Sequence, residues 1–295
     1  MKAALVTAAA VAALAGPAAA QSTPKVEIEH AVARVAVIIE DRDDVAVEVE
    51  QGASALPPVR VERRGSVIEV DGGLGRRMGG MNVSDRIQNC RSGPENRAKA
   101  GDGAAVQVRD IGWVNIADAP LIVIRAPRDV DVSGAGAIYG SVGRGGRSVE
   151  ISNGGCGQWD IANTDGAVSL SIGGSGDMRA GTSRSLEVAI GGSGSVTAGA
   201  TRDLEVSIGG SGDVVVAEAN GPIEVSIGGS GDVNVRQGSA PQVSVSIAGS
   251  GDVQFGGTAG DVDVSMVGGG DVTIARATGQ VSRSIMGGGK VRIGG

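Results

Sequence analysis

The sequence predicts an all-β chain that folds as a right-handed parallel β-helix, or β-solenoid, of about nine short coils, with a small N-terminal β segment capping the first coil. Between Val132 and Gly295, aliphatic residues followed by a version of Gly-Gly-Ser-Gly-Asp recur every 18 to 21 residues, a period typical of stacked repeats. Apolar and polar residues alternate, and no window after Gln21 keeps helical spacing beyond a turn or two. The copies are marked by the residue after the last glycine: Ala137, Gln158, Asp177, Ser195, Asp213, Asp232, Asp252, Asp271 and Lys290.

Residues 1–20 have the features of a cleavable signal peptide. Lys2 precedes an apolar run from Ala3 to Leu14, and small residues end the segment at Ala20. The run is too short to span a bilayer comfortably, and no cysteine stands at the cleavage site to form a lipobox. We therefore expect a mature chain beginning at Gln21 that is periplasmic, secreted or on the cell surface.

The sequence between the signal peptide and the repeats divides into three parts. Alternating valines and isoleucines within residues 21–71 predict four or five short, half-buried strands that cap the stack. The alternation fails over residues 72–103, which we interpret as an insert loop rich in glycine and arginine. Residues 104–130 resume as strands that lead into the repeats at 131–295.

Within one copy, side chains should alternate across the strand. Val206 and Ile208 are expected to point inward and Ser207 outward. One copy cannot bury its thin apolar edge, whereas copies stacked at ~4.8 Å form a continuous core and a rod of roughly 40 Å. We expect glycines at the corners because of positive φ, and either two long or three short sides per coil. The predicted aliphatic column is Ile172, Ile190, Ile208, Ile227, Ile247, Met266 and Ile285.

This arrangement resembles the family of secreted bacterial proteins described as putative auto-transporter adhesin, head GIN domain. The residues that carry the resemblance are the N-terminal strands with Val35 to Glu50, the segment Leu121 to Asp129, and the Gly-Ser-Gly-Asp corners that end at Asp177, Asp213, Asp232 and Asp252. The resemblance implies a β-helix related in shape to pectin lyases, without their catalytic residues, and a role in cell adhesion. The sequence departs from the pattern at 72–103, Ser195 and Lys290.

The charge balance excludes several classes of partner. The formal net charge is −7, and removing Lys2 with the signal peptide makes it −8. Nucleic acid, anionic membranes and acidic polymers are therefore poor partners. We also expect no membrane-spanning segment in the mature chain, because no other stretch is long and apolar enough.

The column of corner aspartates is the candidate for metal binding. Like charges in register repel one another, and calcium at Asp213, Asp232, Asp252 and Asp271 would screen them. However, calcium-binding nonapeptide repeats place their aspartate differently, and Ser195 and Lys290 interrupt the column. We favour aspartates that bond the amides of their own corner, with no metal, and keep a calcium-stabilised repeat as the alternative.

The sequence favours a protein that is not an enzyme, with no catalytic residues and no cofactor. His30 lacks a nucleophile context, and we interpret it as a solvated residue at a strand edge. The alternative is a polysaccharide-active, pectate-lyase-like enzyme, for which Arg179, Arg184 and Arg202 would supply a basic strip. A solvated edge is the simpler interpretation of these arginines.

Cys90 and Cys156 would share an oxidising compartment. A disulfide between them would tether the insert to an early coil, and two free thiols are the alternative that the sequence leaves open.

The sequence gives less evidence for a binding surface than for the fold. An outward column of Ser171, Ser207, Ser226, Ser246 and Ser265 would meet a glycan or keep the face soluble, and only Trp159 and Tyr139 near the first coils offer aromatic platforms. The basic insert would dock a partner or remain solvated. We expect the C-terminal coil to be covered by the insert or to pair with a second molecule as a homo-oligomer. The partner is unknown, and the candidates are a cell-surface glycan or an envelope protein. We expect a structural or surface-interaction role, with cell adhesion the use that the family resemblance implies.

Overall fold

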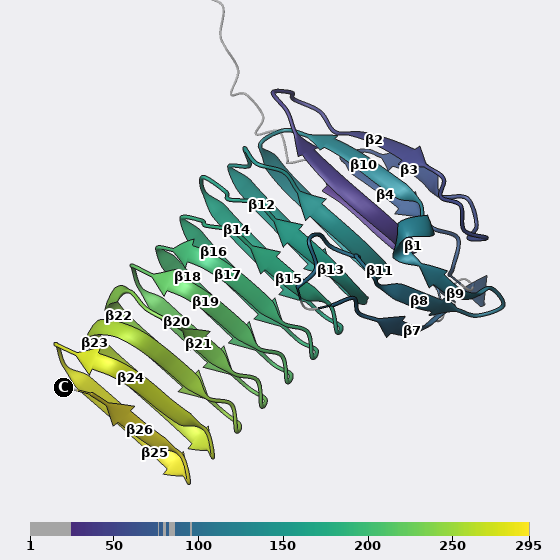
Figure 1. The fold of residues 1–295 in the computed structure, drawn as a ribbon. Coiled ribbons are helices and arrows are strands. Elements are labelled where there is room, and N and C mark those ends of the chain that lie inside the picture. Colours follow the sequence, from purple (N-terminus) through teal and green to yellow (C-terminus); the bar gives the residue numbers. More distant parts are fainter. Residues whose placement is uncertain (1–24, 76, 79–80, 83–85, 95, 295) are drawn as a thin grey trace, which may run out of the picture.

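A computed structural model of the chain describes residues 25–294, with gaps at 76, 79–80, 83–85 and 95. The predicted signal peptide, residues 1–20, lies outside the described residues. The described chain is an all-β rod of stacked coils with a broader N-terminal end, as Figure 1 shows. Its helical content is one 3-10 turn, η1 (Ile116–Asp118), and within residues 25–294 no helix has the length and hydropathy needed to cross a membrane.

Each coil contributes one strand to each of two parallel sheets, which face each other across the core. Sheet one contains, in spatial order, β3 (Arg60–Arg64), β4 (Val67–Asp71), the first part of β1 (Lys25–Ile39), the first part of β11 (Asp129–Val142), β12 (Ser148–Asn153), β14 (Ala167–Ile172), β16 (Ser185–Ile190), β18 (Asp203–Ile208), β20 (Ile223–Ile227), β22 (Ser239–Ile247), the last part of β23 (Val253–Gly268) and β25 (Val281–Gly287).

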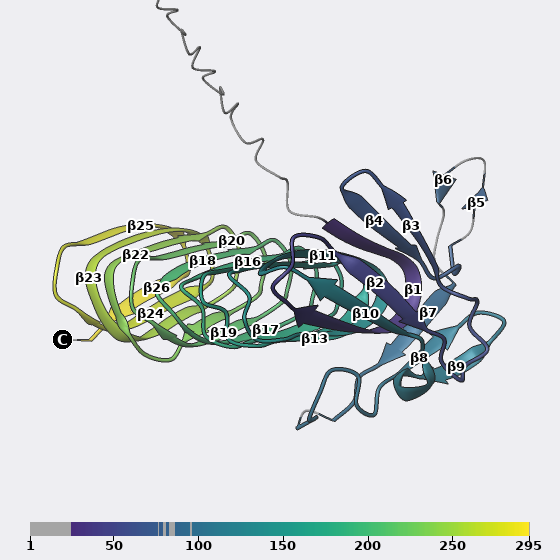
Figure 2. The ribbon, with the colours of Figure 1, turned by 90° about the horizontal axis from the view of Figure 1, so that it is seen from above.

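Sheet two is built in the same way on the other side of each coil. It contains β2 (Ala46–Glu50), β10 (Leu121–Ala126), the last parts of β1 and β11, β13 (Cys156–Ile161), β15 (Asp177–Ala180), β17 (Val196–Thr201), β19 (Val214–Ala219), β21 (Val233–Val235), the first part of β23, β24 (Asp271–Ala277) and β26 (Lys290–Ile293). Figure 2 shows the coils as flattened rings. Each coil therefore has two long sides, and in the later coils a short third ladder links Ala240, Ala259 and Ala277.

The predicted aliphatic column is confirmed by the strand register. Ile172, Ile190, Ile208, Ile227, Ile247, Met266 and Ile285 are consecutive partners in sheet one. All are buried except Ile285 in the last coil. In the coil before Ile172, the same position is occupied by Asn153, which is buried and is the strand partner of Ile172. This column and the matching inward valines form a single apolar core along the rod.

The glycines at the central corners have a different cause from the one predicted. Gly210 and Gly212 do not have positive φ, so the expected left-handed corner is wrong for them. A Cβ at Gly210 would instead clash with the carbonyl oxygen of Gly192, and one at Gly212 with that of Gly194. Successive coils approach so closely at this corner that a hydrogen is the largest substituent that fits.

The N-terminal segment caps the first coil and also lengthens the stack. β1 is itself a coil: it pairs in parallel with β11 on one side and with β4 and β10 on the other. The outermost strands, β3 and β2, are antiparallel to β4 and β10. These edge strands are rich in charge, which disfavours pairing with another chain.

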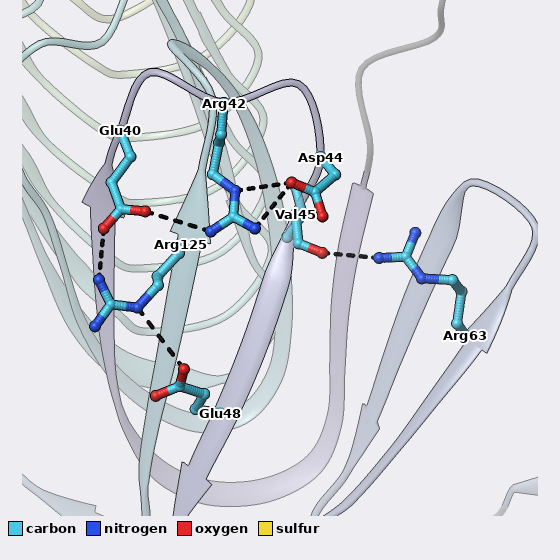
Figure 3. A network of polar contacts seen from close by, with 7 residues as sticks. All are labelled: Glu40, Arg42, Asp44, Val45, Glu48, Arg63 and Arg125. Carbon is cyan, nitrogen blue, oxygen red and sulfur yellow. Dashed lines mark hydrogen bonds and ion pairs between the residues drawn. The ribbon is translucent and has the colours of Figure 1, made fainter.

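A polar network fastens the connection between β1 and β2 to this end of the rod (Figure 3). Glu40 pairs with Arg42 and Arg125, and Arg42 also bonds Asp44. The Nε atom of Arg125 lies 3.8 Å from Oε1 of Glu48 on β2. The Nη2 atom of Arg63 on β3 donates to the backbone oxygen of Val45 at 2.7 Å. The network thus connects both edge strands to the first coils.

The segment predicted as a loop over residues 72–103 contains strands. β5 (Arg77–Met78) pairs with β6 (Met81–Asn82), and β7 (Ile87–Arg91) joins β8 (Ala105–Val108) and β9 (Gly112–Asn115) in an antiparallel sheet. We call β7, β8 and β9 the side sheet. Its inner face packs on outward residues of sheet two in a second apolar cluster containing Val106, Val114, Val32, Ala137 and Tyr139. Pairing with β8, which lies outside the predicted loop, makes β7 a strand.

Candidate interaction surface

The corner aspartates form a hydrogen-bonded ladder between coils. Oδ1 of Asp213 accepts from the backbone nitrogen of Asp232 at 3.0 Å, and Oδ1 of Asp232 accepts from that of Asp252 at 2.8 Å. The ladder continues from Asp252 to Asp271 at 2.7 Å and from Asp271 to Lys290 at 3.0 Å. Each carboxylate therefore satisfies an amide of the next coil.

This geometry corrects the expectation that each aspartate bonds the amides of its own corner. The amide one coil further on lies directly over the carboxylate, because equivalent residues stack in register. Ser195 takes part in the same way: Oδ1 of Asp177 accepts from its Oγ at 2.7 Å and its backbone nitrogen at 3.3 Å. Among the described residues, no group of three or more carboxylate, histidine or cysteine side chains is arranged to hold a metal ion.

The outer face of sheet one carries the predicted serine column beside a column of acids. Ser207, Ser226, Ser246 and Ser265 are consecutive partners and are exposed, whereas Ala189 separates Ser171 from them. Two residues earlier on the strands, Glu187, Glu205 and Glu224 are also in register and exposed. They line a shallow groove of about 450 Å³. This face therefore combines hydroxyl groups with negatively charged side chains.

The basic strip of three arginines, which the enzyme alternative would use, does not form as a set. Arg184 and Arg202 lie on neighbouring coils, where the backbone nitrogen of Arg202 donates to the oxygen of Arg184 at 3.0 Å. Arg179 lies instead on β15 in sheet two, and its Nη1 reaches the backbone oxygen of Arg97 at 3.5 Å. Arg179 therefore lies apart from Arg184 and Arg202, and the three do not form one strip.

The repeated corners and serine column recur coil by coil through the last third of the chain. Residues 199–295 match the family model described as putative auto-transporter adhesin, head GIN domain. The resemblance inferred from the repeats is confirmed for these residues. No curated protein matches the chain.

The head GIN match begins within β17 and ends with the last coil. The N-terminal edge strands, the side sheet and the first coils lie before it. The head GIN residues form the uniform part of the rod, and the irregular features gather at the opposite end (Figure 1). The features that occur once, as a specific site requires, therefore lie where the repeat is broken.

The corner column extends past the head GIN residues to Gln158 and Tyr139. Tyr139 is the register partner of Gln158, which in turn pairs with Asp177. The first copy of the repeat is therefore marked by Tyr139 and not by Ala137, which pairs with Cys156. Counting from Ala137 makes the spacing to Gln158 two residues longer than counting from Tyr139.

Arg97 attaches the insert to Gln158. Its side chain is almost wholly buried, with Nε donating to Oε1 of Gln158 at 2.7 Å and Nη2 to Oδ1 of Asp160 at 3.1 Å. The backbone nitrogen of Gly101 donates to the same oxygen of Gln158 at 3.0 Å. The glutamine is buried, unlike Asp213, Asp232 and Asp252 at the same position of later coils, which are exposed. A neutral amide accepts both donors without adding a carboxylate beside Asp160.

A disulfide makes the second attachment. The structure joins Cys90 on β7 to Cys156 on β13, with the Cα atoms 6.4 Å apart. The bond therefore connects the side sheet to an early coil of sheet two, next to the contact made by Arg97. Together with the second apolar cluster, these contacts hold the side sheet in one position on the rod.

The predicted aromatic platforms are not available at the surface. Tyr139 is covered by the side sheet and Trp159 lies in the core. Burial, and next to it the charge of Asp177, raises the pKa of Tyr139 to about 12. Among the four aromatic side chains, all within the described residues, Trp113 on β9 is the exposed one, at 52%. Sequence reasoning missed it because β9 had no predicted partner that would fix its outer face.

His30 does not lie at a solvated strand edge. It sits within β1 at an irregularity between Ile28 and Ala31, with φ of 51°, and its side chain is 18% exposed. Its Nδ1 lies 3.9 Å from carboxylate oxygens of Glu29 and Asp71. The surrounding groove, of about 280 Å³, is lined by charges of both signs. The described residues that line this groove include no serine, threonine or cysteine that the histidine could activate as a nucleophile.

The last coil of the head GIN region has a charged residue at an inward position. Arg283 is the partner of Val264, which is fully buried in the coil before it. Ile285 and Met286 in the same strand are 41% and 73% exposed. The described part of the insert packs at the other end of the rod, so the expectation that it covers this coil is wrong.

Proposed function

We propose that this protein is a non-enzymatic interaction module of the cell envelope, secreted or periplasmic, whose use is adhesion to a surface. The observation that carries the proposal is the fixed position of the side sheet. A disulfide, a buried arginine and a small apolar core hold an exposed β surface rigidly on a stiff rod. Such pre-organisation lowers the entropy that binding costs.

Two further observations support the proposal. The head GIN family is named for adhesins, and the outer faces of the repeats are polar and nearly uniform from coil to coil. A catalytic site needs a local, non-repeating group of acids, bases or nucleophiles. The repeats instead present the same serine and acidic positions on successive coils.

The test is binding of the fluorescently labelled mature protein to whole cells and to isolated envelopes. We expect saturable binding that the double variant Cys90→Ser with Cys156→Ser weakens, because its side sheet is no longer fixed. The same protein incubated with uronate polymers should release no unsaturated products. Absence of saturable binding would overturn the proposal, and release of such products would establish the lyase alternative.

Fractionation of the producing cell separates the two locations. Adhesion requires that the protein reach the outer surface, where added protease can digest it. We expect protease added to intact cells to remove it. Protein found wholly in the periplasm would exclude adhesion and leave a role as an envelope scaffold.

A further inference from the structure

The outer face of the side sheet gathers planar polar side chains around one exposed aromatic ring. Strand register places Trp113 opposite Gln107, and Gln107 opposite Asn89, so the three residues share this face. The Nδ2 atom of Asn89 donates to Oε1 of Gln107 at 2.6 Å. Asn115, two residues beyond Trp113, points to the same side and is exposed.

Arg91 completes the group. Its guanidinium carbon lies 5.2 Å from the centroid of the Trp113 ring, a cation–π contact that fixes the ring's orientation. With the guanidinium beside its ring, Trp113 is still 52% exposed. The exposed part of the tryptophan is available to a ligand, and covering it on binding would contribute favourable free energy.

We propose that this face binds a neutral glycan. The apolar C–H face of a pyranose ring stacks on an indole, and the amides of Gln107, Asn89 and Asn115 have donors and acceptors for its hydroxyl groups. Arg91 adds further donors at the edge of the ring. This inference rests on the proposed surface-interaction function and names its ligand.

Charge decides between neutral and acidic glycans. The mature chain has more acidic than basic residues, so its net charge is negative. A polyanionic glycan is repelled by this net negative charge, whereas an uncharged one is indifferent to it. Hydrogen bonds and stacking with a neutral sugar need no counter-charge.

The side sheet is also rigid where the ligand would sit. The strand bearing Arg91 contains Cys90, whose sulfur is bonded to Cys156 of the rod. The inner residues Val106 and Val114 are buried against the rod directly behind Gln107 and Trp113. A flat, immobile platform is what a stacked sugar ring requires.

The test uses the full mature protein and a panel of soluble neutral polysaccharides, namely xyloglucan, mixed-linkage β-glucan and mannan, with alginate and polygalacturonate as the acidic arm. Affinity electrophoresis detects binding, and titration of tryptophan fluorescence reports on Trp113, since Trp159 is buried. We expect at least one neutral polymer to bind and to shift the emission. Trp113→Ala should weaken binding about tenfold or more, as loss of about 1.4 kcal/mol of stacking gives.

Controls keep the outcomes distinct. Trp113→Phe should recover part of the affinity, and Val215→Ala, on the same sheet-two side of the rod but remote from the side sheet, should bind like the parent chain. All variants should melt within a few degrees of the parent. Equal affinity of Trp113→Ala, binding of acidic polymers alone, or no binding by the neutral panel would each overturn the glycan site. If the parent still binds envelopes in any of these cases, the proposed function stands and only the ligand assignment falls.

Discussion

The carboxylate of Asp252 accepts a hydrogen bond from the backbone nitrogen of Asp271, at 2.7 Å, one coil further along the rod. The two residues carry the same charge, yet the amide dipole placed between them offsets part of the repulsion. Asp271 is further stabilised in its ionised form, because Arg292 donates a hydrogen bond that lowers the pKa of its carboxyl group. Corner aspartates can therefore stack without a bound cation.

Substituting Asp252 should separate hydrogen bonding from charge. Asp252→Ala removes the acceptor for the amide of Asp271, and we expect Tm to fall by about 2 °C or more. Asp252→Asn keeps an oxygen in the same place and removes one charge from the column, so its Tm should stay within about 1 °C of the parent. Thermal unfolding followed by circular dichroism measures both. A larger loss for asparagine than for alanine would contradict the ladder.

Calcium provides an independent check on the same column. Because each Oδ1 already accepts an amide hydrogen, adding millimolar calcium to the metal-free protein should leave Tm unchanged. Magnesium at the same ionic strength is the control for screening of surface charge. An increase of several degrees specific to calcium would establish the calcium-stabilised repeat.

Tyr139 should make the protein sensitive to alkaline pH. Its pKa is about 12 in the folded chain, against an ordinary value near 10 when unfolded, so the unfolded state loses the proton first. The resulting stability is complete below pH about 10 and is lost as pH rises toward about 12, amounting to about 2 to 3 kcal/mol. The chain has one tyrosine, so phenolate absorbance reports on this residue alone. Tyr139→Phe should remove this component of the alkaline transition, and a phenolate that appears near pH 10 with the fold intact would contradict it.

Breaking the disulfide should loosen the side sheet before the rod. Cys90 and Cys156 are 66 residues apart, and closing a loop of that size is worth about 4 kcal/mol in the chain-entropy account. We expect reduction to expose residues 86–115 to limited proteolysis while the β signal of the coils persists. The double variant Cys90→Ser with Cys156→Ser should behave in the same way without reductant. Equal protease resistance before and after reduction would show that the apolar cluster alone holds the side sheet.

Arg283 should protect the last coil from association. Its charge stands where the core of the previous coil has Val264, so another apolar coil cannot stack there without burying an arginine. Arg283→Val should therefore raise the apparent mass in light scattering at high protein concentration. Arg292→Val, at the exposed face of β26, is the matched control and should have a smaller effect. A parent chain that is already dimeric through this coil would support the predicted homo-oligomer instead.

The sequence predicted what the repeat itself encodes. A period near 19 residues with alternating valine and isoleucine is enough to place Ile208 inside and Ser207 outside, and to set both in register with the next coil. These relations are local and recur in every copy. They require no information beyond the spacing.

The remaining features depend on contacts that occur once. Arg97 and Gln158 are 61 residues apart, and nothing in the period signals that they meet. Trp113 becomes an outer residue only because β9 pairs with β8 and β8 pairs with β7, which lies in the segment predicted as a loop. The repeat shows where the glycine corners lie, but the reason for glycine is the carbonyl of the neighbouring coil, which a single copy of the repeat does not reveal.

The aspartate ladder also has a direction. The carboxylate of each coil accepts a hydrogen bond from an amide of the following coil, and the amide of each coil donates to the carboxylate of the preceding one. Every joint between the coils at Asp213, Asp232, Asp252 and Asp271 is therefore the same, whichever two units meet there. A unit can be duplicated or deleted in the gene without redesigning either junction. Rod length is thus open to rapid evolutionary change, while the side sheet, built from unique partners, must be inherited whole.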